Sequence, residues 1–332
     1  MQRRLLPILL AVGLASAAHA APDPWRVVVA GGERYVALQD VAARYGLGFR
    51  VPPGPNVYLQ SKWSSVVFRV DSREMSYNGT LVWLHAPMIK LRGKWVITES
   101  DAKKIVDPMM RPSAYLSGRG YKVVVLDPGH GQLDRGARGR RGVEEKGVVL
   151  DIAKRVRLQL ANAGIKVYLT RENDRFVVLE DRSVKAARWG ADAFVSIHLN
   201  SATSRKPKGV ETYILAACGY PATAGRSGSR MERTSYAGNR FDHSSAVLGY
   251  YLQKSLVEKT RAEDRGLRRA RFVVLRNAPC PAALVECGFV SNPDEEARIL
   301  TNEHREKIAL GISRGILEYI NTVKRAHVAE GP

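Results

Sequence analysis

Three apolar segments of this chain each lead into a side chain that could ligate a metal ion or transfer a proton. These side chains are His130, His198 and Glu286. The segments before them are residues 123–126, 193–197 and 283–285. Short apolar runs rich in β-branched residues are typical of buried strands. Because ligands bind at the carboxyl ends of the strands in open α/β sheets, three such strands in one sheet would bring these residues to one edge.

Two histidines and a carboxylate are a frequent ligand set of hydrolytic zinc sites, which keep a further position for water. His130 and His198 are too far apart in sequence to share one helix, but two strand ends can bring them together. We expect Glu145 as the third ligand, with Glu144 as the competing choice, because both open the helix after the first strand. Glu286 suits a general base that is not itself a ligand.

From Tyr121 onward, strand-like runs alternate with segments of helical periodicity. This alternation predicts an α/β domain with a mainly parallel twisted sheet and helices on both faces. We expect strands at residues 123–126, 166–170, 193–198, 210–215, 271–275 and 282–285. We expect helices at residues 148–163, 179–189, 244–259, 293–300 and 303–320. The domain would span residues 121–321 and leave residues 322–332 as a polar tail.

Residues 1–20 have the three parts of a secretory signal peptide. Arg3-Arg4 is a short basic region, residues 5–14 are apolar, and Ala18-His19-Ala20 is a cleavage site of the small-x-small type. We expect cleavage before Ala21, and an uncleaved anchor is the alternative. No later segment is long and apolar enough to cross a bilayer. The sequence therefore predicts an exported, most simply periplasmic, protein without a stable membrane span after signal cleavage.

Residues 25–108 predict a small β-rich α+β domain, which a linker at residues 109–120 joins to the rest of the chain. Short strand-like runs and the turn pair Asn78-Gly79 indicate hairpins. The pattern resembles the small N-terminal domain of copper amine oxidases, which recurs in exported bacterial enzymes. Copper is not implied, because this segment holds a single histidine, His85, which we expect to be structural.

The chain is strongly basic, with a formal net charge of +20 at pH 7. Such a charge favours an anionic partner. Export argues against nucleic acid, so we expect an anionic polymer of the cell envelope. A basic surface without a specific partner is the alternative.

The three cysteines are Cys218, Cys280 and Cys287, and an odd number leaves at least one free thiol. The sequence does not decide whether Cys280 forms a disulfide with Cys218 or with Cys287. We expect Cys287 to be buried, because it lies within an apolar strand.

Six short motifs occur in the order seen in zinc-dependent N-acetylmuramoyl-L-alanine amidases, and the chain resembles that family over residues 122–320. The motifs are Asp127-Pro128-Gly129-His130-Gly131, Glu145-Lys146, Thr170-Arg171-Glu172-Asn173-Asp174, Ser196-Ile197-His198-Leu199-Asn200, Gly209-Val210-Glu211-Thr212-Tyr213 and Leu284-Val285-Glu286-Cys287-Gly288-Phe289-Val290-Ser291-Asn292. Each motif is weak alone, and their common order makes the resemblance specific. It implies hydrolysis of the amide between N-acetylmuramic acid and the L-alanine of peptidoglycan, for cell-wall remodelling or daughter-cell separation.

The resemblance also implies the site residues. One Zn²⁺ per catalytic domain would be held by His130, Glu145 and His198. Glu286 would be the catalytic carboxylate, which takes a proton from water and passes it to the leaving amine. Bound zinc lowers the pKa of water to about 7, which makes hydroxide available near neutral pH.

Three further residues are weaker candidates for substrate binding or for support of the ligands. Asn200 either hydrogen-bonds to substrate or a ligand, or caps its loop. Asp127 either fixes its loop or orients His130. His243 either approaches the metal or the glycan, or is a surface histidine. We expect Arg171, Asp174 and Arg182 to form a structural network of ion pairs.

Residues 216–243 form an insertion rich in Gly, Ser and Arg, which we expect to be a mobile surface loop. It would act as a lid that an activator protein removes, or as a glycan-binding flap. The small domain would position the protein on the wall or on a partner, or only stabilise the larger domain. Two other functions stay open: a catalytically silent or partner-activated wall-binding protein, and a zinc peptidase acting on another exported substrate.

Overall fold

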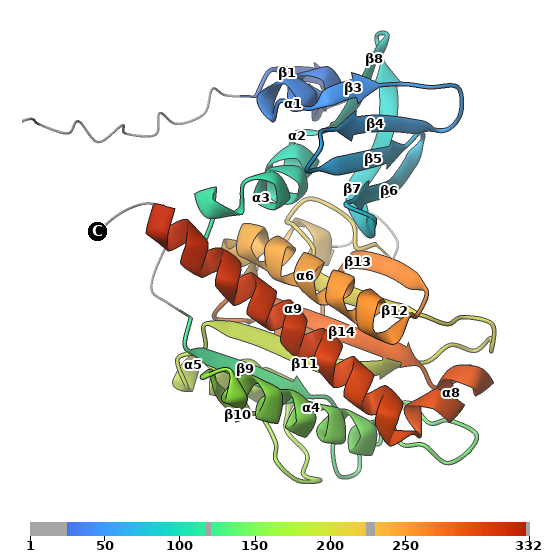
Figure 1. Ribbon diagram of the computed structural model, residues 1–332, viewed down its shortest axis with the longest axis vertical. Helices are drawn as coiled ribbons and strands as arrows, with labels where there is room; N and C mark the ends of the chain where they lie inside the picture. Colours follow the sequence, from blue (N-terminus) through green and yellow to red (C-terminus); the bar gives the residue numbers. More distant parts are fainter. Residues whose placement is uncertain (1–24, 117–120, 224–229, 330–332) are drawn as a thin grey trace, which may run out of the picture.

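The structure is a computed structural model that describes residues 25–116, 121–223 and 230–329. Figure 1 shows a small β-rich unit at the top and a larger α/β unit below it. The expected signal peptide lies outside the described residues. Within them, no helix has both the length and the apolar character that crossing a bilayer requires.

The larger unit is built on a twisted sheet with the strand order β10-β9-β11-β14-β12-β13. The strands are β9 (Val123–Pro128), β10 (Lys166–Leu169), β11 (Ala193–Asn200), β12 (Val210–Leu215), β13 (Asp264–Ala270) and β14 (Ala282–Phe289). The first four strands of this order run parallel. β12 runs antiparallel to β14, and β13 runs parallel to β12. The carboxyl ends of β9, β11 and β14 therefore meet at one edge.

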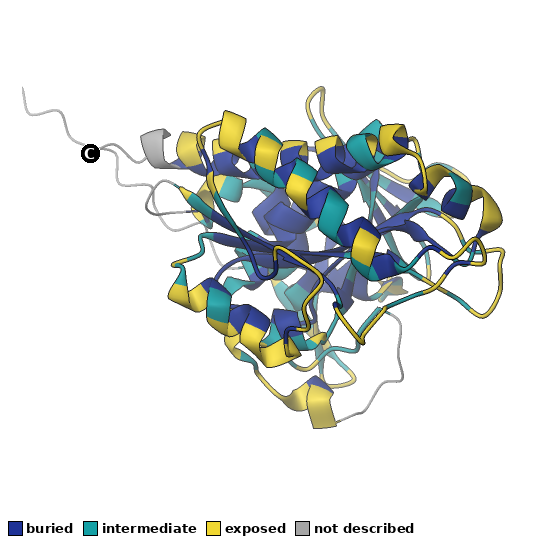
Figure 2. Cartoon of the chain, turned by 90° about the horizontal axis from the view of Figure 1, so that it is seen from below, coloured by how far each residue is buried: buried dark blue, intermediate teal, exposed yellow. Residues whose placement is uncertain are grey.

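Helices cover both faces of this sheet, which confirms the expected α/β layering. They are α4 (Glu145–Asn162), α5 (Leu179–Arg188), α6 (Asp242–Thr260), α7 (Val273–Arg276), α8 (Pro293–Ile299) and α9 (Asn302–Ala329). α4, α6 and α9 pack on one face, and α5 and α7 pack on the other. In α4, Val149, Ile152 and Val156 recur at helical spacing and are fully buried. Figure 2 shows the same division along the helices, with buried sides toward the sheet and exposed sides outward.

The expected strand at residues 271–275 is wrong, because this segment contains α7. The strand before it, β13, has the sequence Asp-Arg-Gly-Leu-Arg-Arg-Ala, which lacks an apolar pattern. Arg265 and Arg268 of β13 are accommodated there because both pair with the buried carboxylate of Glu211. The partner that explains this strand is thus distant in sequence.

Two segments that we expected to be irregular are partly helical. α9 continues to Ala329, so most of the tail expected at residues 322–332 is helix. The linker expected at residues 109–120 begins inside α3 (Asp107–Met110) and continues as the 3-10 turn Pro112–Ala114. The chain that follows the small unit therefore contains helical turns up to Ala114.

The small unit is the expected β-rich domain. Its elements are β1 (Val27–Ala30), β2 (Glu33–Ala37), α1 (Leu38–Arg44), β3 (Gly48–Arg50), β4 (Asn56–Gln60), β5 (Ser65–Arg69), β6 (Ser72–Tyr77), β7 (Thr80–Leu91), β8 (Lys94–Thr98), α2 (Glu99–Asp101), a π-helical turn (Ala102–Val106) and α3. The long strand β7 pairs with β6 on one side and with β8 on the other. His85 on β7 is buried against Asp101 at 2.9 Å, which confirms the expected structural role.

The two units share one continuous sheet, because β7 pairs in parallel with β13 through Val82 and Leu267. The backbone N–H of Leu81 donates to Asp264 at 2.9 Å, next to this pairing. Lys104 and Asp242 form an ion pair of 2.7 Å farther along the same boundary. The small unit is therefore joined to the larger one by hydrogen bonds and charge, in addition to the connecting chain.

The described parts of the insertion at residues 216–243 pack against β13 and the small unit. Thr223 donates its backbone N–H to the carbonyl of Arg269 at 2.9 Å, and the Tyr220 hydroxyl donates to Glu33 at 2.9 Å. The insertion follows β12, which runs antiparallel to β14. It therefore leaves the sheet at the edge opposite to the carboxyl ends of β9, β11 and β14.

Candidate metal centre

The turn after β9 holds His130 in an unusual backbone conformation, with φ of 62°. A positive φ is uncommon for residues other than glycine, and strained backbone of this kind clusters at functional sites. Two buried arginines fix this turn. Arg171 donates to the carbonyls of Pro128 and Gly129 at 3.0 and 2.7 Å, and Arg182 donates to the carbonyl of His130 at 3.0 Å. Both guanidinium groups thus hold the backbone that presents His130.

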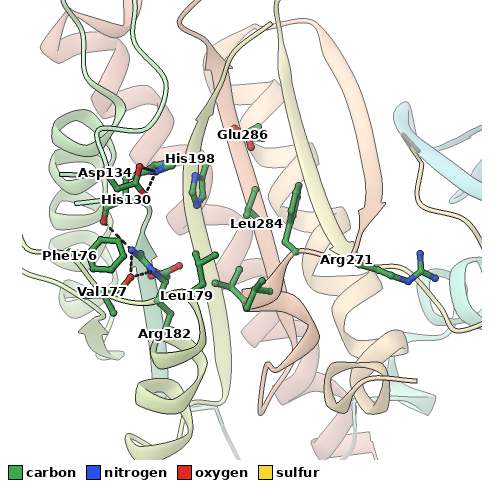
Figure 3. Close-up of a pocket in the computed structure, with 14 residues that line it drawn as sticks. His130, Asp134, Phe176, Val177, Leu179, Arg182, His198, Arg271, Leu284 and Glu286 are labelled. Carbon is green, nitrogen blue, oxygen red and sulfur yellow. Dashed lines mark hydrogen bonds and ion pairs between the residues drawn. The ribbon is translucent and has the colours of Figure 1, made fainter. Parts of the chain in front are cut away.

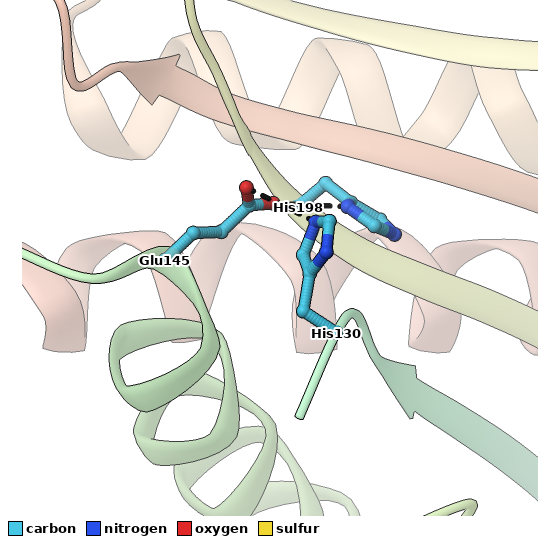
Figure 4. A group of neighbouring side chains, drawn as sticks. All are labelled: His130, Glu145 and His198. Carbon is cyan, nitrogen blue, oxygen red and sulfur yellow. Dashed lines mark hydrogen bonds and ion pairs between the residues drawn. The ribbon is translucent and has the colours of Figure 1, made fainter. Parts of the chain in front are cut away.

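His130, Glu145 and His198 converge on one point, as Figure 4 shows. His130 lies on the turn after β9, Glu145 begins α4, and His198 lies near the end of β11. One carboxylate oxygen of Glu145 lies 3.1 Å from Nε2 of His130, and the other lies 2.9 Å from Nδ1 of His198. One potential ligand atom from each residue lies within 4.8 Å of the other two. The cluster can therefore hold a metal ion between two imidazoles and a carboxylate.

Charge in the cluster shifts two pKa values in opposite directions. Burial favours the neutral form of Glu145, but hydrogen bonds from His130 and His198 outweigh it and hold the pKa of this carboxyl well below its usual range. Burial lowers the pKa of His130, but Glu145 and Asp134 outweigh it and raise the pKa overall. The carboxylate is thus kept ionised at the centre of the cluster.

Two glycines leave room for these side chains. A Cβ atom on Gly129 would come within 2.2 Å of Cε1 of His198. A Cβ atom on Gly136 would come within 2.5 Å of Oε2 of Glu145, and Gly136 also has a φ of 67°. Any larger residue at either position would displace a member of the cluster, because the space is filled by the imidazole and carboxylate groups themselves.

Glu144, the competing ligand, points elsewhere and pairs with Arg135 at 3.2 Å. Asp134 joins the group instead, although sequence reasoning missed it. Both of its oxygens lie 2.9 Å from Nδ1 of His130, on the side of the ring away from Glu145. The signal that could have found it is a carboxylate in the glycine-rich loop directly after His130.

We expect Asp134→Ala to weaken metal binding by about 10- to 100-fold, because an acceptor on the second nitrogen fixes the orientation and tautomer of a ligand imidazole. Competition with a chelating dye measures the affinity. Asp181→Ala, which removes an exposed carboxylate on α5, is the matched control. Equal affinity of the Asp134 variant and the parent would contradict this role.

Glu286 lies next to His198, because the two residues are paired between β14 and β11. Its Oε2 is buried and has no hydrogen-bond partner among the described residues. Burial and the neighbouring carboxylates of Glu145 and Glu211 raise the pKa of Glu286 well above its ordinary value. This carboxyl group is therefore a stronger base than an ordinary glutamate, and one of its oxygens is available.

A cleft of about 500 Å³ opens beside these groups, as Figure 3 shows. His130, His198 and Glu286 line its upper part in this view. Its walls carry exposed apolar side chains, among them Phe176, Leu179 and Phe272. The cleft can accept an extended molecule with its reacting bond next to the metal cluster.

The three weaker candidates have different surroundings, and of these three only Asp127 lines the cleft. Asn200 donates to Glu211 at 2.7 Å. Asp127 accepts from Thr170, Arg182 and Ser196 at 2.6 to 2.8 Å, so it fixes the strand end while Asp134 orients His130.

His243 stacks on Tyr115 with ring centroids 4.4 Å apart, and it is absent from the cleft lining. The insertion also contributes no described residue to that lining, so the structure gives no support to a lid.

The expected network of ion pairs is split into separate contacts. Arg182 pairs with Asp127 at 2.8 Å, and Asp174 pairs with Lys146 at 2.7 Å. Arg171 instead donates to backbone carbonyls. All three cysteines are free thiols, and Cys287 is buried as expected.

Comparison with known proteins identifies what this chain resembles. A family model described as N-acetylmuramoyl-L-alanine amidase matches residues 124–318. The amidase AmiA of Escherichia coli K12 is 37% identical over 246 residues, which are 68% of this chain and 85% of AmiA. The catalytic domain of the amidase CwlV from Bacillus (Paenibacillus) polymyxa var. colistinus has 34% identity and a TM-score of 0.51, and the match covers 60% of this chain and 99% of that domain. The CwlD amidase of Clostridioides difficile, solved in complex with the GerS lipoprotein, has 26% identity and a TM-score of 0.50, covering 60% of this chain and 98% of CwlD.

Proposed function

The chain belongs to the N-acetylmuramoyl-L-alanine amidase family and is a peptidoglycan hydrolase, and from this premise we propose that it works with one zinc ion held by His130, Glu145 and His198. The family assignment confirms the resemblance found in the six motifs. The proposal rests on one observation: two imidazoles and a carboxylate converge beside Glu286, whose Oε2 is buried and has no partner among the described residues.

The donor set fits zinc. Nitrogen and oxygen ligands of this kind are typical of catalytic zinc sites, whereas Ca²⁺ and Mg²⁺ prefer oxygen ligands alone. Glycine at positions 129 and 136 leaves room for these side chains, because a Cβ atom at either position would clash with one of them. Bound zinc would act as a Lewis acid on the scissile carbonyl and would lower the pKa of a water molecule to about 7.

Glu286 is the proposed catalytic carboxylate. Its unpaired Oε2 accepts a proton from the attacking water and then donates it to the nitrogen of L-alanine. A C–O bond forms at the lactyl carbonyl while the C–N bond breaks, which leaves a lactyl carboxylate and a free amino group. Asp134 and the two buried arginines keep His130 in place during these steps.

Two basic loops flank the carboxyl edge of the sheet. Arg138, Arg140 and Arg141 on one loop are exposed and pair with no acidic side chain in the described part of the chain. The other loop, residues 201–208, carries further exposed cations. Both loops are fixed near α8: Arg141 donates its backbone N–H to Glu296 at 2.6 Å, and Asn292 donates to the carbonyl of Arg205 at 3.0 Å. We propose that these two loops, which together form a basic rim, bind anionic groups of the cell envelope.

We expect the double variant R138E/R140E to bind sedimented peptidoglycan at least about tenfold more weakly at low salt, because opposite charges at the rim repel an anionic polymer. The difference should shrink at high salt, where charges are screened. R92E/K94E, which reverses two exposed cations on the small unit, is the matched control. Unchanged binding of R138E/R140E at low salt would contradict the proposed rim.

Export and a partner protein are supported by separate observations. Residues 1–20 have a signal-like composition, and the substrate lies outside the cytoplasm, which together favour the periplasm. The complex of CwlD with the GerS lipoprotein supports a protein partner for this chain as well, and we propose that such a partner acts as an activator.

Digestion of purified peptidoglycan tests the proposed function. The mature protein with zinc should release intact stem peptides with a free L-alanine amino group, detected by mass spectrometry, and a chelator should abolish the release. Cleavage within the stem peptide would identify a peptidase instead. Binding without any release, with zinc and a candidate activator both present, would identify a wall-binding protein.

A further inference from the structure

A row of polar side chains runs from the metal cluster across the sheet. His198 on β11 is paired with Glu286 on β14, and Glu286 is paired with Glu211 on β12. Directly opposed residues on adjacent strands point to the same face of a sheet. Glu211 therefore stands beside the proposed catalytic carboxylate, on the side away from the metal cluster.

Glu211 is a buried carboxylate with every oxygen occupied. Its Oε1 accepts hydrogen bonds from Asn200 at 2.7 Å and from Tyr213 at 2.8 Å. Its Oε2 lies 3.0 Å from Nε of Arg265 and 3.0 Å from Nε of Arg268. Only 2% of the residue is exposed. Four donors and two positive charges thus fix this carboxylate in one position, in contrast to the unpaired oxygen of Glu286.

Trp83 of the small unit contacts the backbone of Arg265 and the guanidinium group of Arg268, whereas the guanidinium group of Arg265 lies over Phe289. Trp83 on β7 donates its indole N–H to the carbonyl of Arg265 at 3.0 Å. The guanidinium group of Arg268 lies over its ring, 4.8 Å from the ring centroid. Gly266 permits this approach, because a Cβ atom there would come within 3.0 Å of Cδ1 of Trp83. The contact chain therefore runs Trp83, Arg265 and Arg268, Glu211, and then Glu286.

We propose that the small unit takes part in positioning the catalytic carboxylate, with Trp83 setting Arg265 and Arg268, and these arginines setting Glu211 beside Glu286. Trp83 and Glu211 are positioning residues, since neither lies in the cleft lining. The inference rests on the proposed role of Glu286. It gives the small unit a part in catalysis that is separate from any binding of the cell wall.

The physical reason lies in the charges around Glu286. Glu286 directly faces Glu211, because the two residues are paired between β14 and β12. Arg265 and Arg268 compensate the negative charge of the Glu211 carboxylate only while both guanidinium groups stay beside its Oε2. If the ring of Trp83 is lost, the guanidinium group of Arg268 loses the aromatic face on which it packs. Arg268 is then no longer held beside Glu211, so the position and charge of Glu211 next to Glu286 are no longer fixed.

Steady-state kinetics on a soluble N-acetylmuramoyl peptide, at a temperature where all variants are folded, test the proposal. We expect Glu211→Gln and Trp83→Leu to lower kcat by about tenfold or more with little change in KM, as is typical when a group that supports a functional side chain is lost. Zinc content should stay at the parent level. Trp83→Phe keeps an aromatic face for Arg268 and should recover most of kcat, whereas Leu fills similar space without that face.

Two controls separate the possible failures. Trp63→Leu removes a tryptophan that is 78% exposed on the same unit and should leave kcat unchanged. Glu286→Gln establishes whether this carboxylate acts at all: an active Glu286→Gln enzyme would refute the proposed role of Glu286, on which the inference rests. If Glu286→Gln is inactive while Glu211→Gln and Trp83→Leu keep kcat within about twofold of the parent, the further inference is wrong. If Trp83→Leu does not fold, the kcat values of Glu211→Gln and Arg268→Lys in the same assay decide whether the further inference holds.

Discussion

Glu286→Gln should lower kcat for amide hydrolysis by about 100- to 10,000-fold, the range associated with loss of a general acid–base. The amide side chain of glutamine is close in size to the carboxylate but cannot accept and return a proton. Metal binding should persist, because Glu286 lies outside the His130–Glu145–His198 cluster. Product release from a soluble muramoyl peptide measures the rate, and elemental analysis measures the zinc content.

Glu303→Gln is the matched control for this experiment. It makes the same chemical change on the exposed side of α9, where the Glu303 side chain is 79% exposed. Its activity should equal that of the parent. A Glu286→Gln enzyme that retains both zinc and ordinary activity would require another proton acceptor in the cleft.

His198→Ala should abolish metal binding and activity together. The change removes one of two imidazoles and leaves Glu145 with a single histidine partner. A metal that binds only the folded protein stabilises it, by about 2.7 kcal/mol at a concentration 100 times Kd. Added zinc should therefore raise the melting temperature of the parent after chelator treatment, and it should leave the melting temperature of the variant unchanged.

His243→Gln serves as the histidine control, since this residue stacks on Tyr115 and is absent from the cleft. It should retain the zinc-dependent rise in melting temperature. A His198→Ala protein that still gains stability from zinc would place the metal elsewhere. Activity of that variant in the presence of a chelator would argue against metal-dependent hydrolysis altogether.

Much of the site was predictable because strand ends have a fixed relation to a parallel sheet. The apolar runs before His130, His198 and Glu286 indicated three strands, and their carboxyl ends do meet at one edge. Glu145 could be expected from its place at the start of the following helix. The resemblance in the six motifs pointed to the family that the comparisons establish.

The roles of Asp134, Asp127 and His243 were not predictable, because the conformation of the loops determines which side chains they contact. Asp134 and Asp127 were both carboxylates near His130, and the sequence offered no reason to prefer Asp134. The turn with φ of 62° at His130 brings Nδ1 to Asp134, while Asp127 faces inward to Arg182. His243 likewise depended on where α6 begins, and the fold places it against Tyr115.

The sequence by itself determined the alternation of strands and helices, the residues at the strand ends and the strongly basic charge, since these follow from local periodicity and composition. Only the tertiary structure decided the direction of β12, the identity of β13 and the junction of β7 with β13. The physical reason is that Arg265 and Arg268 are compatible with a strand only through the buried charge of Glu211 and the ring of Trp83. Such pairings join residues that are remote in sequence, and no local pattern encodes them.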